Sequence, residues 1–207
     1  MREGRVLFIN ELNRMPESVQ NVLLPALDER LLQAPHIGEV RAAPGFQVVA
    51  TQNPVEYVGT GHLSEALRDR FEHLALHYQP AVEEGAIVVA ETGSDDLALV
   101  QTAVRLTRAT RLHPRFRKGA SVRGAIATVA IAERLWSENR DACGPVSRET
   151  LRRAAEAALT TRVDLRDDID ADFGAALDEL FELVVDRGED PDVALASSRP
   201  EGMRPKV

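Results

Sequence analysis

Two short apolar runs, each followed at once by polar residues, constrain the fold of this chain more than any other feature. The first run, residues 5–10 (RVLFIN), is followed by Glu11, and the second run, residues 46–51 (FQVVAT), is followed by Gln52 and Asn53. Continuous apolar runs of this length are typical of strands that are covered on both faces in a parallel sheet. Because ligands bind outside the carboxyl ends of such strands, we expect these polar residues to lie side by side at the functional edge of an α/β sheet.

The residues at these strand ends are suited to activating a water molecule against a phosphate. The carboxylate of Glu11 can polarise the water, and the amide of Asn53 can orient it. Asn10 offers a neutral carbonyl oxygen to Mg²⁺, an ion that takes oxygen ligands and often binds through water. Plainer interpretations stay open, with Glu11 as an ordinary polar residue after a strand and Asn53, which precedes Pro54, as a turn residue.

The remaining pattern predicts further α/β structure up to about residue 80 and helices after it. In the first part we expect a helix over 15–27 that breaks near Pro25, a hairpin over 31–43, a helix from about Ser64 and a third strand over 72–78. In the second part we expect helices over 82–91, 96–110, 122–137 and 147–160 and an amphipathic helix over 170–185. The change of pattern near residue 81 indicates two structural parts.

Composition excludes several classes of function. A net charge of −8 argues against a nonspecific nucleic-acid binder, whose surface would be basic. The single cysteine, Cys143, excludes a disulfide framework. No apolar run approaches the roughly 20 residues that span a bilayer, and the N-terminus lacks the apolar segment of a signal peptide. We therefore expect a cytoplasmic protein without a membrane span.

Four segments, in this order, resemble the second half of an AAA+ ATPase module of the MoxR group. VLFINELNR (6–14) resembles the Walker B strand, and VVATQNPVEYVGTG (48–61) resembles the strand and loop that carry the sensor 1 Asn. LSEALRDRF (63–71) resembles the segment with the arginine finger, and GASVRGAIA (119–127) resembles the start of the lid helix with the sensor 2 Arg. The resemblance covers residues 4 to about 160, and the ordered set is more specific than any one motif.

The resemblance implies a role for each matching residue. Glu11 would activate the hydrolytic water, Asn10 would support Mg²⁺ indirectly, and Asn53 would sense the γ-phosphate of ATP. Arg70 would reach the nucleotide of the neighbouring subunit and stabilise charge in the transition state, while Arg123 would contact the γ-phosphate from the lid of its own subunit. Structural alternatives remain for both arginines: a helix end beside the dipole for Arg70, and a solvated basic cluster for Arg123.

Two departures from the family pattern bear on activity. The 207 residues contain no G-x-x-x-x-G-K-[ST] loop to cradle the phosphates, and Asn10 stands where the family usually has Asp. We therefore expect a truncated member of the group whose isolated chain binds ATP and Mg²⁺ weakly and is inactive alone.

In a full-length form, the resemblance implies ATP hydrolysis in a homo-oligomeric, hexameric ring that remodels or matures partner proteins in a chaperone-like manner, with a von Willebrand factor A-domain protein as a partner. The alternatives are a non-catalytic ring subunit or regulatory module that no longer binds nucleotide, and, more remotely, a plain α/β interaction module.

The expected fold is a partial αβα parallel-sheet sandwich, an AAA+ core without its first strand and P-loop, followed by an all-helical lid. We place the core at residues 1–80, the lid at 81–165, a C-terminal amphipathic helix at 166–186 and a disordered tail at 187–207. A sheet with strands missing should expose an apolar edge or face.

Overall fold

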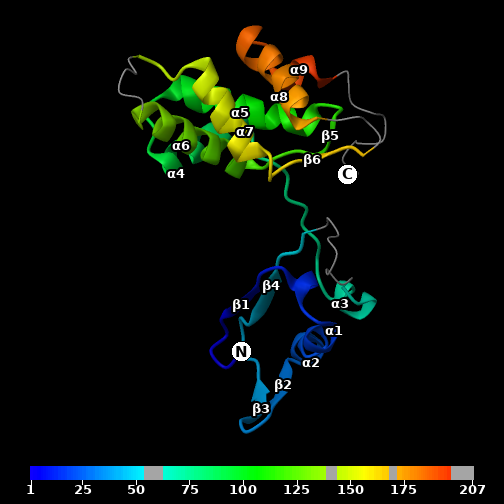
Figure 1. Ribbon diagram of the computed structural model, residues 1–207. Helices are drawn as coiled ribbons and strands as arrows, with labels where there is room; N and C mark the ends of the chain where they lie inside the picture. Colours follow the sequence, from blue (N-terminus) through cyan, green and yellow to red (C-terminus); the bar gives the residue numbers. More distant parts are fainter. Residues whose placement is uncertain (54–62, 139–143, 168–171, 197–207) are drawn as a thin grey trace. The chain divides into compact units, whose positions relative to one another are not determined.

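The computed structural model describes residues 1–53, 63–138, 144–167 and 172–196. The chain divides into two compact units, Met1–Leu76 and His77–Val207, which Figure 1 shows in blue to cyan and in green to red. The first unit combines helices with strands, and the regular elements among the described residues of the second are helices apart from one short pair of strands. The predicted fold class, a partial α/β core followed by a helical part, is confirmed.

A parallel pair of strands forms the centre of the first unit. β1 (Val6–Ile9) pairs with β4 (Gln47–Ala50), in a register that sets Val6 opposite Gln47 and Ile9 opposite Ala50. Both strands were predicted from their apolar runs. The pair is not covered on both faces, since Phe8 is 60% exposed and Val49 is 47% exposed. The expected exposure of an apolar edge or face is thus confirmed.

The segment between the two strands holds short helices and a hairpin. The predicted helix over 15–27 is divided into α1 (Glu17–Gln20) and α2 (Leu23–Asp28). Pro25 is the third residue of α2, where no intrahelical acceptor is available and its missing N–H costs little. The chain therefore breaks before Pro25 rather than at it. The predicted hairpin is present as antiparallel β2 (Leu31–Ala34) and β3 (Gly38–Arg41).

The first unit ends with one helical turn and an extended segment. A 3₁₀ turn, η1 (Leu12–Arg14), follows β1. The helical turn near the end of the unit is α3 (Glu65–Arg68), and the Ser64 hydroxyl caps it as predicted. The predicted strand over 72–78 is wrong, because the structure has no strand there. Within the part of the chain that the structure describes, no strand pairs with this segment, and Leu74 and Leu76 are more than 80% exposed.

The second unit is built around a continuous helical core. Its elements are α4 (Ala81–Thr92), α5 (Leu97–Leu112), α6 (Val122–Glu138), α7 (Arg148–Leu159), α8 (Phe173–Phe181), the π-helical turn η2 (Glu182–Asp186) and α9 (Pro191–Ala194). All five predicted helical segments are present. The two short strands β5 (Phe116–Lys118) and β6 (Asp164–Leu165) pair antiparallel within this unit. Gly124 favours the close packing of α6 on α7, since a Cβ there would lie 2.9 Å from Leu159 Cδ2 and the leucine side chain would have to shift.

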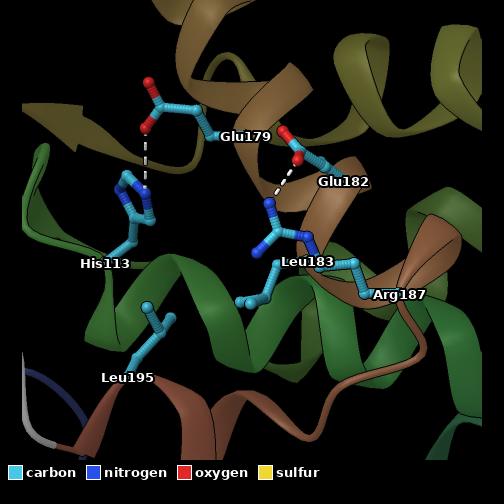
Figure 2. Close-up of a pocket in the computed structure, with 6 residues that line it drawn as sticks. All are labelled: His113, Glu179, Glu182, Leu183, Arg187 and Leu195. Carbon is cyan, nitrogen blue, oxygen red and sulfur yellow. Dashed lines mark hydrogen bonds and ion pairs between the residues drawn. The ribbon is translucent and has the colours of Figure 1, made fainter.

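Helix α8 and the turn η2 after it pack on α5. Residues of these elements line a pocket that Figure 2 shows. His113 Nε2 lies 3.1 Å from the Glu179 carboxylate, which also pairs with Arg115. Burial lowers the pKa of His113 below its usual value, and the charge of Glu179 opposes that effect. The arginine of the following turn, Arg187, pairs with Glu182 on the other side of the pocket.

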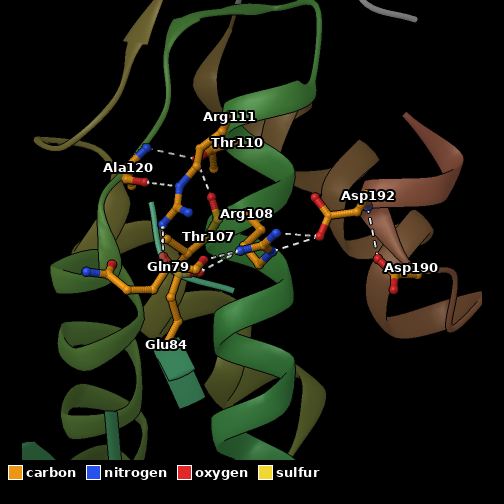
Figure 3. A network of polar contacts seen from close by, with 9 residues as sticks. All are labelled: Gln79, Glu84, Thr107, Arg108, Thr110, Arg111, Ala120, Asp190 and Asp192. Atoms are coloured by element: carbon orange, nitrogen blue, oxygen red, sulfur yellow. Dashed lines mark hydrogen bonds and ion pairs between the residues drawn. The ribbon is translucent and has the colours of Figure 1, made fainter. Parts of the chain in front are cut away.

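A buried carboxylate joins α4, α5 and the chain that enters the second unit (Figure 3). Glu84 is 1% exposed and pairs with Arg108 at 3.0 Å and with Arg111 at 2.8 Å. Arg108 also donates to the Gln79 carbonyl and pairs with Asp192 of α9. Residues 187–196, which we expected to be disordered, are therefore tied to the core, whereas residues 197–207 lie outside the described residues.

Replacing Glu84 by Gln should destabilise the chain by about 1–3 kcal/mol, because two partly buried guanidinium groups lose their shared counter-charge. Urea unfolding of the full chain measures the effect. Glu91→Gln, an exposed change on the same helix, is the matched control and should stay within about 0.5 kcal/mol of the unmodified chain. Equal effects of the two substitutions would contradict a structural role for the Glu84 cluster.

Candidate active site

The parallel pairing continues past the ends of both strands and brings their polar tips together. The Thr51 N–H donates to the Ile9 carbonyl at 2.9 Å, and the Thr51 carbonyl accepts from the Leu12 N–H at 2.8 Å. The residues after β1 therefore lie directly against the residue after β4. This is the adjacency that the two apolar runs predicted.

Asn10 and Glu11 are both held by the side chain of Thr51. The Thr51 hydroxyl donates to Asn10 Oδ1 at 2.7 Å and accepts the Glu11 N–H at 3.0 Å. Sequence reasoning did not select Thr51 as a site residue. The available signal was a hydroxyl-bearing residue as the last member of an apolar run, at the point where the strand meets the candidate site.

Glu11 has a backbone conformation that is uncommon for residues other than glycine. Its φ of 54° and ψ of 51° lie in the left-handed region. Its carboxylate is 43% exposed and pairs with Arg14, three residues later, at 2.9 Å. An exposed pair of this kind contributes about 0–1 kcal/mol, so the carboxylate can exchange Arg14 for another partner at little cost.

The backbone of Asn53 is held by a buried side chain of η1. Asn13 is 8% exposed, and its Nδ2 donates to the Asn53 carbonyl at 3.2 Å. The Asn53 side chain is itself exposed. The structure thus brings Asn10, Glu11 and the backbone of Asn53 to one edge of the sheet, and Asn13 is a second supporting residue that sequence reasoning missed.

Arg70 lies just after α3 and is paired within its own unit. Its Nε donates to Asp28 Oδ1 at 2.6 Å, and its guanidinium also donates to the Ala66 carbonyl. The hydrogen bond from Arg70 lowers the pKa of the Asp28 carboxyl below its usual value. The contacts of Arg70 are therefore with α2 and α3 rather than with the strand tips.

Arg123 belongs to the second unit. It is the second residue of α6, and it is exposed. Its proposed function as a nucleotide contact stays a prediction, because it depends on how this helix approaches the first unit.

The oxygen atoms at the strand tips suit a magnesium ion that binds chiefly through water. They comprise the carboxylate of Glu11 and the amide oxygen Asn10 Oδ1. The latter accepts a hydrogen bond from the Thr51 hydroxyl. Mg²⁺ usually keeps several waters and takes one or two protein oxygens together with substrate phosphates. Within the described ranges no group of three His, Cys, Asp or Glu residues could hold a metal by itself. In the same ranges no helix has the length and apolar character needed to span a bilayer.

Comparison with known proteins finds a family profile that matches the first unit. Residues 1–71 match the profile of the AAA domain, dynein-related subfamily. An uncharacterised protein of Staphylococcus epidermidis is 34% identical over 113 residues, which are 54% of this chain and 43% of that protein.

Two further relatives carry functional names. The gas vesicle ATPase GvpN of Ancylobacter aquaticus is 31% identical over 63% of this chain and 38% of its own length. The gas vesicle ATPase GvpN2 of Halobacterium salinarum is 29% identical over 91% of this chain and 52% of its own length. The chain therefore spans about half or less of these relatives, and they agree with the family that the four sequence motifs predicted.

Removal of the Arg70 side chain should raise the pKa of Asp28 toward the ordinary value of about 3.9. Because the folded-state pKa of Asp28 is lowered, the pair stabilises the fold above about pH 4, and this stabilisation is lost as the pH falls through the folded value. Carboxyl-carbon NMR titration of Arg70→Ala measures the shift. The control is Arg68→Ala on the same helical turn, and an Asp28 titration unchanged in both variants would contradict the ion pair.

Proposed function

We propose that this chain is an AAA+ ATPase of the MoxR type and that its first unit supplies the water-activating edge of an ATP-hydrolysing site, a proposal that the matching AAA profile and the two gas vesicle ATPases support. The observation that carries the proposal is the register of β1 with β4, which sets Glu11 beside the segment that leads to Asn53. A carboxylate at that place can accept a proton from water as it attacks a phosphate. The proposed reaction is hydrolysis of the γ-phosphate of ATP.

The roles of the residues follow from their chemistry. Glu11 exchanges its surface pair with Arg14 for a water molecule and acts as the general base. The Asn53 amide, carried by a backbone that Asn13 holds, orients that water and the terminal phosphate. Asn10 supports Mg²⁺ through water, and the ion, when bound, neutralises charge on the phosphates.

Two arginines complete the proposed site from outside the strand tips. Arg70 leaves Asp28 for the phosphate of a neighbouring subunit, where a guanidinium stabilises the charge that develops in the transition state. Arg123 at the start of α6 contacts the same phosphate from the helical unit of its own subunit. The phosphate-cradling loop is not among these 207 residues, so the complete site needs one from elsewhere.

A site of this kind requires an assembly in which subunits meet at the nucleotide. We propose a homo-oligomeric ring, with six subunits as expected for the family, that acts in the cytoplasm. Its hydrolysis would remodel or mature partner proteins in a chaperone-like manner, with a von Willebrand factor A-domain protein as a partner. The names of the gas vesicle ATPases support an ATP-driven function, and the net charge of −8 is consistent with protein rather than nucleic-acid partners.

A second candidate function rests on the same departures from the family pattern. Asn10 replaces a carboxylate, and no phosphate-binding loop is present in the 207 residues. A non-catalytic ring subunit, which contributes Arg70 to a neighbour without hydrolysing ATP itself, would have these properties. ATP turnover by the unmodified assembly distinguishes the two functions.

In the assembled, nucleotide-binding form, Glu11→Gln should leave ATP binding intact and lower turnover about 10²–10⁴-fold, because an amide cannot accept the proton. Arg70→Ala should lower it about 10³-fold or more by acting on the neighbour's site. Mixing the two inactive variants should recover activity, since some interfaces then pair an intact Glu11 with an intact Arg70.

Two controls test whether the loss of turnover depends on the position of the substituted residue. Glu17→Gln, an exposed change on α1, should keep the unmodified rate. An assembly in which every subunit carries both substitutions should stay inactive. Near-normal turnover of Glu11→Gln would refute the general-base role, and an absence of recovery on mixing would refute action of Arg70 between subunits.

A further inference from the structure

Thr51 makes four hydrogen bonds to four successive residues at the end of β1. Its backbone N–H donates to Ile9 and its backbone carbonyl accepts from Leu12. Between them, its hydroxyl donates to Asn10 Oδ1 and accepts the Glu11 N–H. The residue that follows β4 thus contacts each of the four residues through which β1 leads into η1.

We propose that the Thr51 hydroxyl is the group that positions Glu11 for proton transfer. The left-handed backbone of Glu11 is unfavourable for a residue with a side chain, and it persists only where neighbouring contacts define it. The hydroxyl supplies such a contact at the Glu11 N–H itself. This inference rests on the proposed function, because it assigns Thr51 a role through Glu11.

The geometry requires a group that donates and accepts through the same atom. The hydroxyl oxygen accepts the Glu11 N–H, and the hydroxyl proton is donated to Asn10 Oδ1, an amide oxygen that can only accept. Serine and threonine offer both functions on one atom, and valine offers neither. Thr51→Val therefore removes both side-chain bonds while it keeps the shape of the residue and both backbone bonds.

The hydroxyl also sets the orientation of the neighbouring amide. It donates to Asn10 Oδ1, and this bond holds the amide with its oxygen toward Thr51. The same hydrogen bond fixes the position of the oxygen that is proposed to support Mg²⁺. Thr51 is thus a positioning residue for two site groups and a direct ligand of neither reactant.

The first arm of the test measures amide hydrogen exchange in the full chain by NMR and needs no activity. In the unmodified chain the Glu11 N–H should be protected. In Thr51→Val it should exchange roughly five- to tenfold faster, as expected for the loss of one hydrogen bond. The Leu12 N–H, which is bound to the Thr51 backbone, should keep its protection, and Thr51→Ser should restore that of Glu11.

Thr102→Val is the matched control for the loss of a threonine hydroxyl. The Thr102 hydroxyl donates to the Ala98 carbonyl within α5, in the second unit. This variant should leave the exchange of the Glu11 N–H unchanged. An unprotected Glu11 N–H in the unmodified chain, or equal exchange in Thr51→Val, would overturn the proposed geometry.

The second arm measures steady-state ATP hydrolysis in the assembled form. Thr51→Val should lower kcat roughly tenfold and leave KM within about twofold, because the general base is displaced while substrate contacts remain. Thr51→Ser should return kcat close to the unmodified value. A merely structural role would lower the active fraction without this rescue, or would raise KM together with the loss of kcat.

The Glu11→Gln variant separates a failure of this inference from a failure of the proposed function. If Glu11→Gln is inactive and Thr51→Val hydrolyses ATP at the unmodified rate, the positioning role is refuted while the general base stands. If Glu11→Gln hydrolyses ATP normally, the proposed function fails, and the role of Thr51 in catalysis fails with it.

Discussion

The parallel register of β1 on β4 is the constraint on which the rest of the candidate site depends. With Ile9 opposite Ala50, the residue that follows β4, Thr51, meets the two residues that follow β1. A slip by one residue would turn the Thr51 side chain to the other face of the sheet. The hydroxyl would then lose both Asn10 and Glu11, and the left-handed turn at Glu11 would lose its side-chain support.

At these strand ends the chain is held in place more by hydrogen bonds than by burial of apolar side chains. In the first unit the buried apolar residues are few and include Leu12 and Phe46, whereas Val6 and Phe8 of the central strand are more than half exposed. The second unit has a continuous core and a buried ion cluster around Glu84. We therefore expect stability to be unevenly distributed, with local opening easier in the first unit than in the second.

The sequence alone located helices and strands correctly where the local pattern and the tertiary structure favour the same conformation. Apolar runs located both central strands, and the helical stripes located every long helix. The predicted strand over 72–78 failed because alternation cannot show whether a neighbouring strand is available. The tail beyond residue 187 was read as disordered because its composition is polar, and the contact of Asp192 with Arg108, a residue 84 positions away, leaves no local pattern.

The residues of the candidate site that interrupt an apolar run were predicted from the sequence, whereas the residues that support them were not. Glu11 and Asn53 stand out because polar residues interrupt an apolar pattern. Thr51 does not stand out, since threonine is common in strands and its importance lies in the register of two segments 40 residues apart. The ion pair of Arg70 with Asp28 was not predicted either, because Asp28 lies on a different helix.

The amide at position 10 changes the charge of the site more than its geometry. Asn10 Oδ1 accepts the Thr51 hydroxyl as a carboxylate oxygen would, so the hydrogen bonds at the strand tip do not require Asp. What is lost is a second negative charge beside Glu11, and with it part of the attraction for a divalent ion. Because Glu11 is the one carboxylate that the strand tips offer among the described residues, Mg²⁺ at this edge would depend mainly on phosphates for its opposite charge. Metal and nucleotide would then bind together, and the Thr51 hydroxyl would keep the general base in place whether or not they are bound.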